Sequence, residues 1–149
     1  MNGKTRSFTL YEAASRMIDE RAAATSLGHS MLKGSKNYSR VVDSALERYE
    51  LLVRKNLPKL EVGEWRVVLE AIGGVRFETS LIGSSVDMVV EFIDCACEEA
   101  DEKDFAVDLE SFKAKLKRLN LAKRIALVDQ VEKIWAALAR GEKPLVPGE

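Results

Sequence analysis

Apolar and polar side chains recur with a helical period between residues 37 and 54. At about 100° per residue, one side of the predicted helix collects the apolar residues Val41, Val42, Ala45, Leu46, Tyr49 and Val53. The opposite side collects Arg40, Asp43, Glu47 and Arg54. Asn37 and Ser39 can each cap the first turn by accepting a backbone N–H bond, and Pro58 ends the pattern because proline cannot continue a helix. The stretch therefore predicts an amphipathic helix that ends near residue 55.

The same reading predicts an alternating strand and five more helices. Residues 4–10 alternate between Thr5, Ser7 and Thr9 on one face and Arg6, Phe8 and Leu10 on the other, as a β-strand requires. Such a strand has no partner nearby, so it is either a frayed tail or the mate of the same strand in a second subunit. Helical spacing is expected over residues 11–24, 62–72, 85–99, 109–119 and 121–139, with the last helix capped by Asn120 and central to the core. Residues 25–36 are expected to form a loop and residues 98–104 a solvated connection.

Charge divides the chain into two parts. Residues 1–59 contain 11 Lys or Arg and 6 Asp or Glu, a net charge of +5, whereas residues 60–149 contain 12 and 18, a net charge of −6. A basic head followed by an acidic body is typical of a nucleic-acid-binding module attached to a second domain. With Leu57-Pro58-Lys59 as the hinge, we expect domains at residues 1–56 and 57–149.

Candidate chemistry for an enzyme is absent from the sequence. His29 is the only histidine, and no phosphate-binding loop, dinucleotide fingerprint or nucleophile elbow is present. Cys95 and Cys97 point in different directions on a helix, so we expect neither a disulfide nor a shared metal. We therefore predict a protein with no catalytic residues, no metal and no cofactor. No apolar run is long enough to span a membrane and the N-terminus has no hydrophobic signal core, so we expect a cytoplasmic protein.

The order strand, helix, loop and helix over residues 4–55 resembles the ribbon-helix-helix family of DNA-binding proteins. The likeness is carried by the strand residues Phe8 and Leu10 and by the helical spacing of Ala14, Ile18 and Ala22. It is also carried by the sequence Ala45-Leu46-Glu47-Arg48-Tyr49, which ends the segment that resembles the second helix of the family. The resemblance implies a mainly α fold, with one short strand paired across a homodimer and an all-helical body behind it. The loop between the helices is longer than is usual in that family, and Arg6 stands where an apolar residue is common.

Under this resemblance the two-stranded ribbon enters the major groove of double-stranded DNA. Thr5, Ser7 and Thr9 would face the bases. Phosphates would be contacted by Lys4, Arg6, Lys33, Lys36, Asn37, Tyr38 and Ser39. The dimer core would comprise Phe8, Leu10, Ile18, Val42, Ala45, Leu46 and Tyr49. The implied function is a homodimeric transcriptional repressor whose second part oligomerises or binds an effector or a protein partner. The alternatives are an antitoxin and an all-helical protein-interaction adaptor that binds no nucleic acid.

Overall fold

The computed structural model describes residues 12–26, 35–73, 85–144 and 146–147, and these residues form seven helices and no strand. The expected fold class, with a strand as its first element, is therefore wrong. Helices satisfy their own backbone hydrogen bonds, whereas a lone strand needs a partner. The strand was expected at residues 4–10, which lie outside the described residues.

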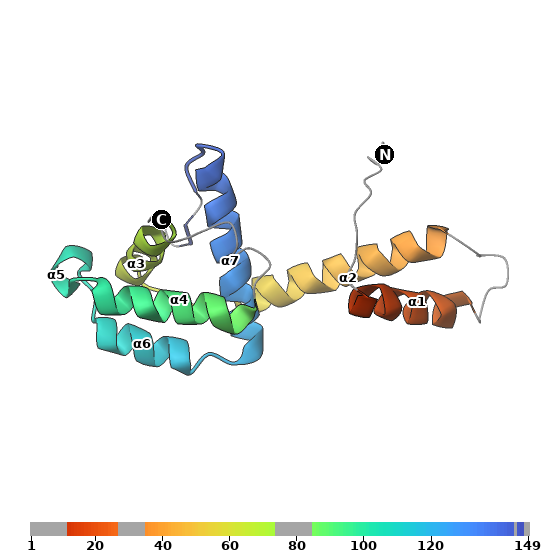
Figure 1. Ribbon diagram of the computed structural model, residues 1–149, viewed down its shortest axis with the longest axis horizontal. Coiled ribbons are helices and arrows are strands. Elements are labelled where there is room, and N and C mark those ends of the chain that lie inside the picture. Colours follow the sequence, from red (N-terminus) through yellow and green to blue (C-terminus); the bar gives the residue numbers. More distant parts are fainter. Residues whose placement is uncertain (1–11, 27–34, 74–84, 145, 148–149) are drawn as a thin grey trace. The chain divides into compact units, whose positions relative to one another are not determined.

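The chain divides into two compact units, residues 1–50 and residues 51–149. Unit 1 holds α1 (Glu12–Ser26) and most of α2 (Ser35–Asn56), which are shown in Figure 1. The division falls inside α2, whereas the boundary expected from the sequence follows this helix. Ala22 is buried in unit 1, and Ile18 and Val42 are half-buried.

Unit 2 is built around α4 (Val86–Glu99), which packs against α3 (Val62–Gly73), α6 (Leu109–Lys117) and α7 (Leu121–Ala139) (Figure 1). The helix α7 also packs against α3. The sequence assigned the central position to the last helix, but α4 packs against three helices, whereas α7 packs against α3 and α4. The buried side chains of this core come from all four helices and include Trp65, Val68, Val89, Ile93, Phe112, Leu116, Leu127, Val131 and Ile134.

Short polar side chains start four of these helices. Ser85, Asp101, Asp108 and Asn120 each accept a backbone N–H bond within the first turn of the helix that follows. The cap predicted at Asn120 is confirmed, with a distance of 2.9 Å from the Lys123 nitrogen to its side-chain oxygen. These caps satisfy backbone groups that the first turn of a helix leaves unpaired.

One helix of unit 2 was not predicted. The four-residue helix α5 (Glu102–Phe105) lies where a solvated connection was expected, and it contacts α3. It ends at Ala106, whose φ of 51° places it in the left-handed conformation that closes a helix. The Glu102 carboxylate accepts a hydrogen bond from the Leu109 N–H at 3.3 Å, and this bond ties α5 to the start of α6.

Candidate functional site

Helix α2 carries a stripe of exposed apolar side chains in unit 1. Tyr38, Leu46 and Tyr49 are 43%, 58% and 41% exposed, and their spacing places them on one side of the helix. On the flank next to this stripe, Val41 and Ala45 are half-buried. Val42, which lies between Tyr38 and Leu46 on the same side of the helix, is also half-buried. One copy of the chain therefore covers part of the apolar face of α2 and leaves Tyr38, Leu46 and Tyr49 exposed.

The expected dimer-core residues fall into three groups. Leu46 and Tyr49 belong to the exposed stripe, Val42 is half-buried within it, and Ala45 is half-buried beside it on the same helix. Ile18 is half-buried on α1 of the same unit. Phe8 and Leu10 lie outside the described residues.

The expected DNA-contacting residues are described only in part. Thr5, Ser7, Thr9, Lys4, Arg6 and Lys33 lie outside the described residues. The helix α2 begins at Ser35. Lys36 and Asn37 therefore belong to its first turn, and Tyr38 and Ser39 follow as exposed residues of the same helix. Asn37 and Ser39 were expected to precede the helix as caps, and the helix instead starts upstream of both.

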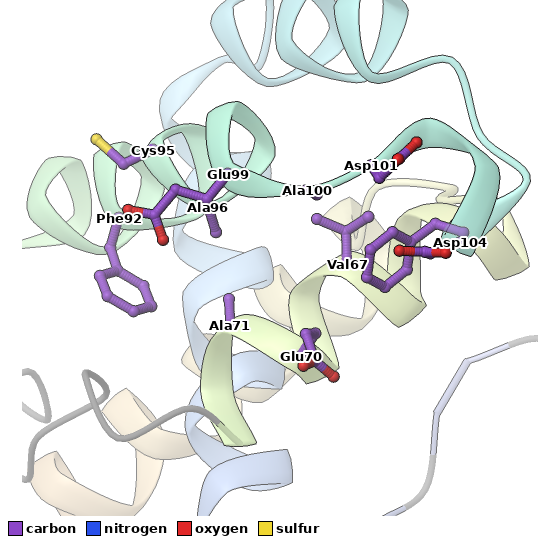
Figure 2. A pocket seen from close by; sticks show the side chains of 11 residues that line it. Val67, Glu70, Ala71, Phe92, Cys95, Ala96, Glu99, Ala100, Asp101 and Asp104 are labelled. Carbon is purple, nitrogen blue, oxygen red and sulfur yellow. The ribbon is translucent and has the colours of Figure 1, made fainter.

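A second candidate site is a cavity of about 500 Å³ in unit 2. Its walls come from Val67, Glu70 and Ala71 on α3, from Phe92, Cys95, Ala96 and Glu99 on α4, from Ala100 and Asp101 in the connection, and from Asp104 and Phe105 on α5. Figure 2 shows the methyl groups of Ala96 and Ala71 directed into the same space from the two facing helices. Small residues at these positions keep the space open between larger neighbours.

The cavity joins apolar walls to several carboxylates. Glu70, Glu99, Asp101 and Asp104 contribute carboxylates from α3, α4, the connection and α5, and all four residues are exposed. The Asp101 carboxylate also caps α5, accepting the Lys103 N–H at 3.0 Å. Among the described residues that line the cavity there is no Lys, Arg or His. The charged side chains among the described lining residues are therefore all acidic.

The two cysteines occupy different environments, as the helical spacing predicts. Cys95 is exposed and lines the cavity, although Figure 2 shows its sulfur directed away from the other lining side chains. Cys97 is buried in the core. Burial, together with the nearby charge of Asp94, raises the pKa of the Cys97 thiol to about 11, and Lys113 opposes this shift. The Cys97 thiol is therefore protonated and unreactive at neutral pH.

The sequence reading missed the cavity. Its one local signal is the series Phe92, Ala96 and Glu99, which recurs at helical spacing on a side of α4 next to the core stripe. The facing wall from α3 and the end wall from α5 lie at other places in the sequence, so helical periodicity within one segment does not bring them together.

Two other kinds of site are absent from the described ranges. These ranges contain no group of three or more His, Cys, Asp or Glu side chains arranged to hold a metal ion. None of the helices in them is both long and apolar enough to cross a membrane. Comparison of the chain with protein-family models, with curated proteins and with solved structures gives no match.

Proposed function

We propose that the protein is a homodimeric DNA-binding protein of the cytoplasm that represses transcription, with unit 1 as its dimerisation and DNA-binding part. The observation that carries the proposal is the exposed stripe of Tyr38, Leu46 and Tyr49 on α2. Large apolar side chains gathered on one face indicate a surface that a partner covers. A second copy of α2 offers an identical apolar stripe, and a two-fold axis pairs identical surfaces.

The charge distribution supports DNA as the ligand of this dimer. Residues 1–50, which form unit 1, contain 8 Lys or Arg and 6 Asp or Glu, a net charge of +2, and Arg54, Lys55 and Lys59 raise the net charge of the first 59 residues to +5. On α2 the exposed side chain of Arg40 lies opposite the apolar stripe, and the exposed side chain of Arg48 lies about 100° around the helix from Tyr49. Dimerisation through the stripe therefore leaves these arginines accessible to phosphates, and the N-terminal turn of the same helix offers backbone N–H groups to a phosphate.

Dimerisation is tested with two leucines of α2 that share a similar exposure. Leu46 is 58% exposed and lies in the stripe, whereas Leu51 is 51% exposed and lies on the far side of the helix. By sedimentation velocity, we expect Leu46→Glu to convert the dimer to a monomer, because two buried carboxylates would oppose each other. Leu51→Glu is the matched control and should leave the dimer intact. A wild-type protein that stays monomeric at every concentration would contradict the proposal.

DNA binding is tested by fluorescence anisotropy with random duplex DNA over a salt series. Neutralising phosphates releases counterions, so the logarithm of affinity should fall linearly with the logarithm of salt concentration. Arg40→Gln with Arg48→Gln should reduce this slope by roughly one unit for each phosphate that the arginines no longer neutralise. Asp43→Asn with Glu47→Gln, on the same helix, should not reduce it. A folded dimer that binds no duplex at low salt rules out the DNA-binding function.

An all-helical interaction adaptor is the second candidate function. It is favoured by the same exposed stripe, because an amphipathic helix of another protein can cover it as well as a second copy of α2. A monomer that binds no DNA is the result that favours this candidate.

A further inference from the structure

The cavity of unit 2 combines three properties that together indicate a class of ligand. Its volume of about 500 Å³ lies within the range of sites for drug-sized molecules, roughly 300–1,000 Å³. Its walls include the half-buried rings of Phe92 and Phe105 and the buried side chain of Val67. Its polar groups are carboxylates, with no basic side chain among the described lining residues.

A cavity with aromatic walls and acidic side chains at its edges disfavours anions, and its apolar walls disfavour small hydrated ions. Aromatic faces attract cations through the negative face of the ring, most strongly where water is excluded. Carboxylates add an attraction that acts over several ångströms and requires no fixed ligand geometry. A cation with delocalised or shielded charge gives up little hydration when it enters, so it gains from both the rings and the carboxylates.

We propose that this cavity binds a lipophilic organic cation. The apolar walls receive the body of the ligand, and Glu70 from α3 and Asp104 from α5 supply negative charge from two elements that are distant in the sequence. The small side chains of Ala71 and Ala96 provide the room between the helices (Figure 2). This binding is independent of DNA binding by unit 1, so either proposal can fail without the other.

The test uses a cation and an anion of the same shape. Tetraphenylphosphonium and tetraphenylborate present four phenyl groups around one charge of opposite sign, and triphenylphosphine oxide is a neutral analogue. Isothermal titration calorimetry of the full chain should detect tetraphenylphosphonium binding, much weaker binding of the oxide and no binding of the borate. A higher salt concentration should weaken binding of the cation only in part, because the apolar contacts are not screened.

Two variants locate the site. Glu70→Gln with Asp104→Asn should weaken tetraphenylphosphonium binding roughly tenfold, as expected for two partly screened charges near the ligand. Asp43→Asn with Glu47→Gln removes the same charge from α2 and should leave the affinity unchanged. Ala96→Leu keeps every charge and fills the cavity, so it should also weaken binding.

Several results overturn the proposal. The first is that tetraphenylphosphonium does not bind. The second is that the oxide or the borate binds as tightly as tetraphenylphosphonium. The third is that the substitutions on α2 weaken binding as much as the substitutions at Glu70 and Asp104. Binding that survives Ala96→Leu also overturns it, because the ligand then sits elsewhere. A basic amphipathic peptide that binds where tetraphenylphosphonium does not would assign the surface to a protein partner instead.

Discussion

Glu64 is the one charged side chain that is fully buried among the described residues, at 3% exposure. Its carboxylate lies 2.6 and 2.7 Å from the Lys115 ammonium on α6, and it accepts the Glu61 backbone N–H at 2.7 Å. Because it stands in the first turn of α3, its charge also interacts favourably with the helix dipole. The buried carboxylate is thus compensated by groups from two parts of the chain.

Lys115→Met should destabilise unit 2 by about 1–3 kcal/mol, because it leaves the Glu64 carboxylate buried without its counter-ion. Urea unfolding measures this change in the free energy of unfolding. The double variant Glu64→Leu with Lys115→Met should cost less than the sum of the two single changes, since the pair is removed together. The matched control is Arg140→Met, which removes an ion pair to Glu142 in which both side chains are over half exposed, and it should not shift the unfolding midpoint. If Lys115→Met and Arg140→Met changed the free energy of unfolding equally, burial of the ion pair between Glu64 and Lys115 would not contribute to stability.

Local periodicity could not predict the burial of Glu64. The apolar stripe of its helix comprises Val62, Trp65, Val68, Leu69 and Ile72. Trp65, Val68 and Ile72 are buried, Leu69 is half-buried and Val62 is exposed. Glu64 follows no apolar spacing, and its partner Lys115 is 51 residues further along the chain. A buried charge becomes acceptable only when the tertiary fold supplies its partner, and a one-segment pattern carries no information about that partner.

At the scale of elements, α3 approaches the turn between α5 and α6 at Gly63. A Cβ at this position would lie 2.6 Å from the Phe105 carbonyl oxygen and 3.0 Å from the Val107 Cβ. The first of these neighbours is backbone and cannot rotate away. The close approach explains how a helix as short as α5 is held against α3.

Gly63→Ala should destabilise the protein by about 1–3 kcal/mol, because the added methyl group forces α3 away from the turn. Gly73→Ala is a matched control in the same helix, since a Cβ there meets nothing within 4 Å. It should be neutral or stabilise by less than about 1 kcal/mol, as alanine favours a helix over glycine. Thermal unfolding followed by circular dichroism compares the two variants. A Gly63→Ala protein as stable as the Gly73→Ala protein would contradict this account of the close approach.

The helices of unit 2 could be predicted from the sequence because they bury one face against a common core. The expected ranges 62–72, 109–119 and 121–139 correspond to α3, α6 and α7 to within two residues. The helix α5 was not predicted from the sequence because its four residues, three of them charged, are too few to show a helical period of apolar side chains. On α2 the apolar face follows from spacing, but which of its residues are exposed does not, and the cavity requires three helices to meet.

At the scale of the whole molecule, the two units differ in how much apolar surface they bury. Among the described residues, Ala22 is the one buried hydrophobic side chain of unit 1, whereas unit 2 has a continuous core containing Trp65, Phe112 and Ile134. Burial of apolar area is the main stabilising contribution to a fold. The described part of unit 1 therefore contributes little apolar burial within one copy, and burial of the stripe on α2 in a dimer would add to it.

This contrast predicts that the stability of unit 1 depends on protein concentration. Dimerisation stabilises the folded state by mass action. Over about a hundredfold rise in concentration, we therefore expect amide hydrogen exchange in α1 and the first part of α2 to slow several-fold. Exchange in the core of unit 2, at α4 and α7, should stay the same because its stabilising contacts lie within one chain. Leu46→Glu should abolish the concentration dependence and Leu51→Glu should preserve it. Exchange rates in α1 and α2 that are already slow and do not vary with concentration would mean that unit 1 is stable as a single copy, and the exposed stripe would then be available to a different partner.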